Sequence, residues 1–120
     1  MPPELVAAPT RIPVPGGKII DEYVGRVTTG EAAVSVARMT APAGWSEPAQ
    51  TPAFDEVTVV LEGSVVVEHD GGTLEVSAGQ AVVTRAGERV RYLAGPDGAA
   101  YVAVCLPAFA PDLAHRDPED

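Results

Sequence analysis

The stretch Gly44–Gly63, GWSEPAQTPAFDEVTVVLEG, carries the most information about the fold of this chain. Its second half is rich in β-branched residues and ends in a glycine, which is typical of a strand that leads into a turn. Glu56 is followed, after six residues, by Gly63, and the segment Pro48–Pro52 that precedes this glutamate contains no histidine. The stretch therefore predicts a strand that carries a carboxylate without a neighbouring imidazole.

A second pattern of glycines follows in Gly79–Val90, GQAVVTRAGERV. The two patterns are separated by SVVVEHDGGTLEV, in which Asp70-Gly71-Gly72 supplies the residues with positive φ that a tight hairpin needs. We therefore expect two strand-rich segments joined by a hairpin.

These segments, in this order and at this separation, resemble the two sequence motifs of the cupin superfamily, and the resemblance spans roughly Ala33 to Leu106. Gln80, Arg85 and Val90 stand where the second motif has Asp, Pro and a metal-binding His, and the His-x-His of metal-dependent cupins is absent from the first. The chain looks most similar to small single-domain cupins of the ethanolamine-utilisation-protein type, some of which also lack the histidines. The resemblance implies an all-β fold, the cupin-type double-stranded β-helix or jelly-roll barrel.

Composition agrees with a single all-β domain. The 120 residues can bury one core, and the 12 glycines and 12 prolines suit many short strands joined by turns. We expect an extended N-terminal arm over 1–17, a barrel over 18–109 and an acidic surface tail over 110–120. Eight strands are expected in the barrel, namely KIIDEYVGRV, AAVSVARMT, VTVVLEG, SVVVEH, TLEV, AVVT, ERVRYL and AAYVAVCL.

Charge and hydropathy narrow the classes of partner. A net charge of −9 with dispersed Lys and Arg argues against nucleic acid, whose phosphates require a concentrated basic surface. No apolar run approaches the roughly 20 residues needed to cross a bilayer, and the first residues do not have the pattern of a signal peptide. With the single cysteine, Cys105, these features predict a cytoplasmic protein without membrane contact. Exposed strand edges favour a homodimer.

Side-chain alternation along the strands indicates which groups face the barrel interior, because residues two apart share a face. If Glu56 points inward, Thr58 does too. Tyr92 shares the face of Val90, the position of the lost histidine. On the preceding strand, an inward Val34–Val36 pair would carry Arg38 inward.

The resulting cluster can hold a small polar or anionic molecule and move protons. A carboxylate in an apolar barrel has a raised pKa and can act as a general acid or base near neutral pH. Each member can also have a role without catalysis or binding. Arg38 and Glu56 can form a structural ion pair, and Gln50 can hydrogen-bond within its loop. Tyr92 can pack in the core, and Lys18 can be exposed to solvent. The expected catalytic residues are Glu56, Tyr92 and Lys18, and the expected substrate-binding residues are Arg38, Gln50, Trp45 (over the pocket rim) and Arg85 (at its entrance).

No metal and no cofactor are expected. His69 falls at the hairpin turn and His115 in the tail, so both are expected at the surface. Glu56 with Gln50 is a poor substitute for the two-histidine, one-carboxylate arrangement that holds catalytic metals.

Three classes of function remain open. The first is a metal-independent lyase, isomerase or cyclase that acts by acid–base chemistry, which the resemblance permits. The second is a binding or sensing module, and the third is a structural cupin without a filled pocket.

Overall fold

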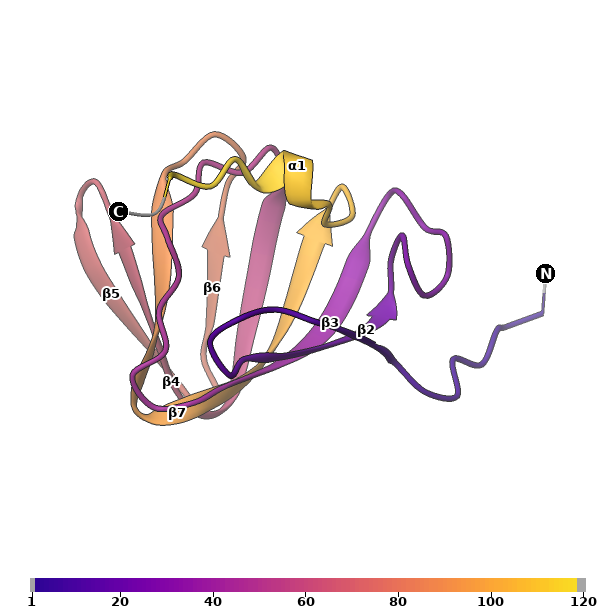
Figure 1. Ribbon diagram of the computed structural model, residues 1–120, viewed down its shortest axis with the longest axis horizontal. Helices are drawn as coiled ribbons and strands as arrows, with labels where there is room; N and C mark the ends of the chain where they lie inside the picture. Colours follow the sequence, from indigo (N-terminus) through magenta and orange to yellow (C-terminus); the bar gives the residue numbers. More distant parts are fainter. Residues whose placement is uncertain (1, 119–120) are drawn as a thin grey trace.

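The computed structural model describes residues 2–118, so Met1 of the expected arm and Glu119 and Asp120 of the expected tail lie outside the described residues. The described part contains seven strands and one short helix (Figure 1). Their bounds are β1 (Thr10–Ile12), β2 (Ile19–Val24), β3 (Ser35–Ala41), β4 (Asp55–His69), β5 (Gly72–Ser77), β6 (Ala81–Thr84), β7 (Val90–Leu106) and α1 (Pro111–Ala114).

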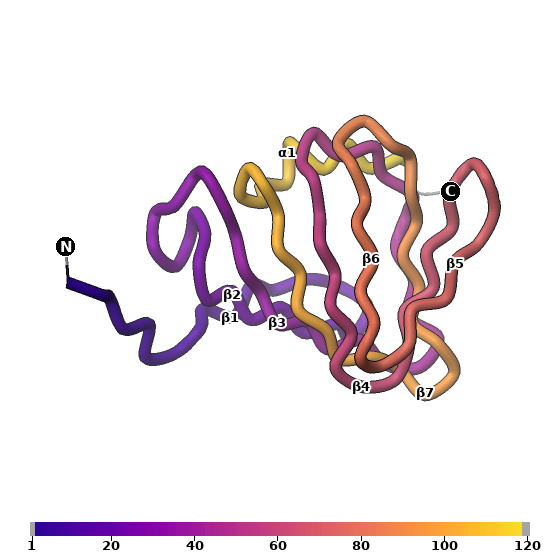
Figure 2. Tube along the Cα trace, turned by 180° about the vertical axis from the view of Figure 1, so that it is seen from behind, coloured from indigo at the N-terminus to yellow at the C-terminus, as the bar shows by residue number. Residues whose placement is uncertain are grey.

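All strand pairs are antiparallel, in the order β1-β2-β3-β7-β4-β5, with β6 added to β4. The first half of β4 pairs with the second half of β7, and its second half pairs with the first half of β7. β6 and β5 lie against the two successive halves of β4, as Figure 2 shows from the side opposite to Figure 1. This arrangement confirms the all-β prediction.

β4 and β7 each join two strands that the sequence predicted as separate. The pairing of β4 with β7 shifts its register between Val60 and Glu62 and again between Gly63 and Val65. Gly63 has φ 69°, and a Cβ atom there would collide with the carbonyl oxygen of Gly98 on β7. A glycine at this bulge lets the strand bend and continue, so the expected turn at Glu62-Gly63 is a bend that helps to close the barrel.

The core lies between the two halves of the barrel. On β4 the alternation is as predicted, with Thr58 and Val60 buried at 0% and 1% exposure while Val59 is 38% exposed. Most of the core is Val and Ala because aromatic residues make up only 5% of the chain. The buried core cluster consists of Ala41, Trp45, Val60, Val65, Val67, Val76, Val82, Val90, Tyr92, Ala99, Tyr101 and Ala103.

Part of the C-terminal segment packs against the barrel. It crosses the ends of the strands, with α1 beside the end of β7 (Figure 1). Ala114 is 1% exposed and belongs to a second buried cluster with Phe54 and Cys105. The segment is tied to the stretch before β4 by backbone hydrogen bonds, since Ala53 N–H donates to the Leu113 carbonyl at 2.8 Å.

The N-terminal segment also takes part in the fold. β1 pairs with β2, which adds an unpredicted strand to the sheet edge, while the residues before it extend away from the barrel (Figures 1 and 2). Ile12 and Val14 turn their side chains toward the barrel cavity.

Between residues 2 and 118, none of the helical structure is long and apolar enough to traverse a bilayer.

Candidate functional site

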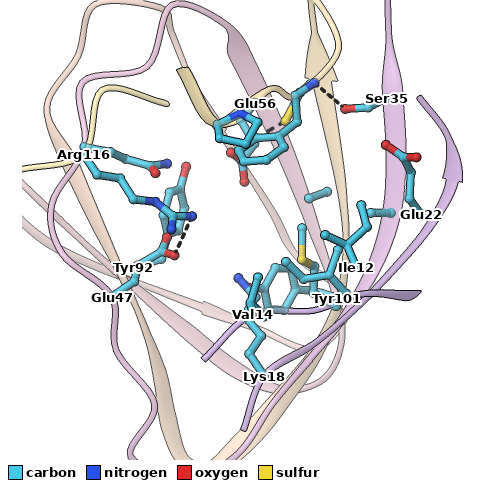
Figure 3. A pocket seen from close by; sticks show the side chains of 18 of the residues that line it. Ile12, Val14, Lys18, Glu22, Ser35, Glu47, Glu56, Tyr92, Tyr101 and Arg116 are labelled. Carbon is cyan, nitrogen blue, oxygen red and sulfur yellow. Dashed lines mark hydrogen bonds and ion pairs between the residues drawn. The ribbon is translucent and has the colours of Figure 1, made fainter. Parts of the chain in front are cut away.

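A cavity of about 280 Å³ lies inside the barrel, between the inner faces of β2, β3 and β7 and the C-terminal segment (Figure 3). Its lining mixes an apolar wall with charged and polar groups drawn from all parts of the chain. The lining residues are Ile12, Pro13, Val14, Lys18, Ile20, Glu22, Ser35, Ala37, Met39, Glu47, Gln50, Glu56, Tyr92, Tyr101, Ala103, Cys105, Phe109, Pro111 and Arg116.

Glu56 extends from β4 into this cavity, as its strand position predicted, and is 9% exposed. Thr58 Oγ1 donates to its Oε2 at 3.3 Å, and the Cys105 thiol is 3.9 Å from its Oε1. The pKa of Glu56 is raised to about 7, mainly by burial and in addition by the nearby charge of Glu47, while the Lys18 ammonium and the two hydrogen bonds act in the opposite direction. Glu56 is therefore poised to hold or release a proton near neutral pH.

Tyr92 lies in the same cavity on β7, where its predicted inward position is found at 3% exposure. Its hydroxyl is 2.9 Å from Thr84 Oγ1 on β6. Burial, reinforced by the charge of Glu56, raises the pKa of Tyr92 above its ordinary value. Tyr92 therefore stays neutral at physiological pH and is available only as a hydrogen-bonding hydroxyl.

Lys18 enters the cavity from the residue before β2, and its ammonium points inward (Figure 3). Its Nζ lies 4.2 Å from the centroid of the Trp45 ring and 5.6 Å from that of Tyr101. Burial lowers the pKa of Lys18, whereas the carboxylates of Glu47 and Glu56 oppose that change. The two aromatic faces stabilise the charged form through cation–π attraction.

Gln50 is 4% exposed and lines the cavity next to Val90. Two backbone hydrogen bonds join it to Val90, because Gln50 N–H donates at 2.8 Å and Val90 N–H donates back at 2.9 Å. Its side-chain Oε1 is buried without a hydrogen-bond partner among the described residues. An unpaired buried carbonyl is costly, so a hydrogen-bond donor that reached this amide would stabilise the site.

An ion pair that the sequence did not reveal borders the cavity. Arg116, from the C-terminal segment, has its Nη2 3.5 Å from Glu47 Oε2 (Figure 3). An isolated bridge pairs Arg116 with Gln50, which holds the segment across this side of the barrel. No local pattern marked either residue, because they are far apart in the chain and meet only when the C-terminal segment packs.

β3 turns toward the cavity the face opposite to the predicted one. Ser35, Ala37 and Met39 line the cavity, and Arg38 is exposed on the outer face, so the inward placement of Arg38 is wrong. Both faces of β3 carry apolar residues, so the alternation of side chains along the strand could not show which face points inward. The inward side chains of β3 form the cavity wall beside Tyr101.

Two other expected binding residues also lie outside the cavity lining. Arg85 is exposed, and its Nη1 is 3.6 Å from Asp55 Oδ2 on the surface, so it does not guard the entrance. Trp45 is 7% exposed and belongs to the core, where its ring supports Lys18 from beneath instead of covering the rim.

Glu22 and Cys105 are cavity residues that the sequence did not single out as site residues. Glu22 Oε2 accepts hydrogen bonds from Thr28 N–H at 2.9 Å and from Thr28 Oγ1 at 2.8 Å, so this carboxylate anchors the turn after β2. Burial and the charge of Glu56 raise the pKa of the Cys105 thiol, which makes it a packed side chain and a poor nucleophile.

The donor atoms of this cavity do not fit the metal centre that cupin motifs usually supply. Val90 occupies the inward position of the second-motif histidine with a side chain that has no donor atom, and the Tyr92 hydroxyl, whose pKa is raised by burial, stays protonated and is a poor metal ligand. His69 and His115 are both exposed, as expected. Among residues 2–118, no three or more His, Cys, Asp and Glu side chains are grouped in a way that could hold a metal ion.

The chain is similar to part of one curated protein. The endoribonuclease YbeY of Myxococcus xanthus is 49% identical over 107 residues, which make up 88% of this chain but 36% of that protein. The chain thus spans about a third of the length of this relative. No protein-family model matches the sequence.

Solved structures with the same architecture are more distant in sequence. The polyketide cyclase RemF of Streptomyces resistomycificus superposes with a TM-score of 0.74 at 18% identity, over 100% of this chain and 88% of that one. A variant of oxalate decarboxylase from Bacillus subtilis gives 0.77 at 16% identity, over 92% of this chain and 31% of that one. The EutQ protein of Clostridium difficile gives 0.64 at 19% identity, over 76% and 63%. The strand order and these likenesses together show that the chain has the cupin fold.

Proposed function

We propose that the chain is an enzyme of the lyase, isomerase or cyclase type, which binds a small molecule in the barrel and acts on it by metal-independent acid–base chemistry. The observation that carries this proposal is Glu56: a buried carboxyl, open to the cavity, with a pKa of about 7. A general acid or base works best when its pKa is close to the operating pH. Carboxyl groups with shifted pKa values also occur in ion-pair networks that have only a structural role. Glu56, however, forms no ion pair among the described residues.

The surrounding groups suit a proton transfer at a carbon next to a carbonyl. Glu56 in its carboxylate form would take the proton, and the charged Lys18 and the neutral hydroxyl of Tyr92 would stabilise the negative charge that develops on the oxygen. Protonated Glu56 would then return the proton to the far carbon of a conjugated dienolate, which moves the double bond, or to a hydroxyl on the β-carbon, which leaves as water. This sequence gives isomerisation in the first case and loss of water in the second.

The likeness to a polyketide cyclase supports this class of chemistry only as an analogy, because at 18% identity it concerns the fold. Absence of metal participation is likewise part of the proposal. It rests on Val90, which has no donor atom, and on the protonated hydroxyl of Tyr92, which is a poor metal ligand.

The test is proton exchange in heavy water, followed by proton NMR, with a panel of 2-oxo acids, 3-oxo acids and 3-hydroxy acids. We expect wild-type protein to exchange a C–H proton of at least one compound for deuterium, so that its proton signal disappears. Glu56→Gln should abolish that exchange. Tyr92→Phe should retain part of it. The proposal fails if no compound exchanges above the buffer rate, or if Glu56→Gln exchanges as fast as wild type.

A second candidate is a ligand-binding, sensing or structural module without turnover. The observation that favours it is that the sequence matches about a third of a longer protein, as expected of a module that accompanies another activity. In that case a compound would bind in the cavity with equal affinity before and after Glu56→Gln, and no exchange would be seen.

Assembly and location belong to the proposal as well. We propose a homodimer, because Val59, Leu61 and Val83 are 38%, 45% and 48% exposed on β4 and β6. A cytoplasmic location fits the single buried thiol of Cys105, and an acidic chain of net charge −9 is a poor partner for nucleic acid.

A further inference from the structure

We propose that the ligand of the cavity is a small monocarboxylic acid that also carries a hydroxyl group, with its carboxylate at Lys18 and its hydroxyl at the side-chain amide of Gln50. This inference rests on the proposed function for the identity of the site, and it adds the class of substrate. Two unsatisfied groups carry it: the Lys18 ammonium, which points into the cavity, and the buried, unpaired carbonyl of Gln50, a residue that lines the same cavity.

The Lys18 ammonium forms no ion pair with a carboxylate of the described residues. It lies against the faces of Trp45 and Tyr101. Taking a charge out of water is costly unless an opposite charge compensates for it. Of the carboxylates that act on Lys18, Glu47 is paired with Arg116, and burial disfavours the charged form of Glu56. A ligand anion would supply the missing partner.

The local charge favours a carboxylate over a phosphate. A doubly charged phosphate is usually held by several donors, often a bidentate Arg. Arg116 is already paired with Glu47, which leaves Lys18 as the cation that points freely into the described cavity. Glu22, Glu47 and Glu56 border the same space, so a second negative charge on the ligand would be repelled.

Gln50 identifies the second group. Its Oε1 is buried and accepts nothing, whereas its backbone is held in place by Val90. A site with a buried unpaired acceptor discriminates strongly in favour of a ligand that brings a donor. A hydroxyl group meets this requirement without adding a charge that would compete with Lys18 for the carboxylate.

The remaining wall sets the size and polarity of the ligand body. Ile12, Val14, Ile20 and Met39 line the cavity with apolar side chains. The cavity volume of about 280 Å³ equals that of about nine water molecules in the liquid. The space therefore suits a branched aliphatic acid of roughly that number of non-hydrogen atoms.

The experiment uses three aliphatic probes, 2-hydroxy-3-methylbutanoate, 3-hydroxy-3-methylbutanoate and 4-hydroxy-3-methylbutanoate. Each has two matched controls, its primary amide and the acid without the hydroxyl. Isobutyl phosphate tests the dianion. Binding is followed by the fluorescence of Trp45, the single tryptophan, whose ring lies 4.2 Å from Lys18 Nζ. Protein variants are Lys18→Met, Gln50→Met and, as a matched control, Arg38→Met, which removes an exposed cation from the outer face.

We expect at least one hydroxy acid to bind about 10- to 100-fold tighter than its amide, and about fivefold tighter than the acid without the hydroxyl. Lys18→Met should remove the first preference and Gln50→Met the second, while Arg38→Met should leave both unchanged. Circular dichroism of each variant verifies folding, and Lys18→Arg should restore part of the first preference.

The inference is overturned if amides bind as well as acids, if isobutyl phosphate binds tightest, or if Lys18→Met leaves the preference intact. Its failure is distinguishable from failure of the proposed function, because Glu56→Gln should abolish proton exchange without abolishing the preference for acids over amides. Acid binding through Lys18 with unchanged exchange in Glu56→Gln would refute the acid–base role alone.

Discussion

Replacing Glu56 with glutamine should stabilise the protein in mild base and leave its stability nearly unchanged in mild acid. Glutamine has almost the same shape as glutamate and cannot ionise. In the folded protein the Glu56 carboxyl is buried and has a pKa of about 7, against an ordinary value of 4.5. The variant therefore removes the ionisation of this buried carboxyl and changes little else in the folded protein.

The sign and the size follow from proton linkage. Below about pH 4.5 the carboxyl is protonated in both the folded and the unfolded chain, so its stabilising contribution is fully present. As the pH rises through about 7, the folded protein must ionise a buried group, and that contribution is lost. At about 1.4 kcal/mol for each pH unit between the two pKa values, the loss amounts to about 3 kcal/mol.

The measurement is urea unfolding followed by Trp45 fluorescence, at about pH 5 and about pH 8.5, for wild type and Glu56→Gln. The difference in free energy of unfolding between the two proteins should grow by about 2.5 kcal/mol from the lower to the higher pH. With an m-value of about 2 kcal/mol/M, this corresponds to a change of about 1.2 M urea in the difference between the two midpoints. Glu62→Gln, an exposed carboxylate on the same strand, is the control and should follow wild type. A difference that changes by less than about 1 kcal/mol would show that Glu56 is not a buried, raised carboxyl.

Three further predictions follow from the same contacts. Ala114→Asp, which buries a charge beside Phe54 and Cys105, should reduce the free energy of unfolding by about 3 kcal/mol or more, whereas wild-type stability would mean that the C-terminal segment does not pack on the barrel. Light scattering should give twice the 12.4 kDa mass of one chain, and Val83→Lys should return the mass to that of one chain; a wild-type mass of 12.4 kDa would refute the dimer. Elemental analysis of untagged protein should find well under one transition metal ion per chain, and EDTA should not change the unfolding midpoint; a full equivalent that survives dialysis would contradict the metal-independent proposal.

The strands themselves were largely predictable, because each is a short β-branched run bounded by Gly or Pro. Their continuity was not. A glycine after a strand is compatible both with a turn that ends the strand and with a bend within it. At Gly63 the strand bends and continues, and the carbonyl of Gly98 on β7 lies so close that it excludes any side chain. That contact joins residues distant in the chain, so local sequence contains no trace of it.

The candidate site was predictable to the extent that one face of a strand was clearly distinguished. The inward positions of Glu56 and Tyr92 followed from alternation anchored on the motif positions. Arg38 was misplaced because β3 is apolar on both faces, so its orientation is decided by what packs against it. Arg116 was missed because it reaches the cavity only through the packing of the C-terminal segment.

The sequence by itself determined the all-β class, the inward carboxylate and the loss of the histidines, because these depend on residue type and on spacing along one strand. Tertiary structure alone decided which charges meet. It placed Lys18 over Trp45, left the Gln50 carbonyl unpaired and brought Arg116 to Glu47. Burial and the distance between charges are properties of the folded chain. The pKa of about 7 at Glu56, on which the proposed acid–base chemistry depends, therefore exists only once the barrel has closed around that carboxyl.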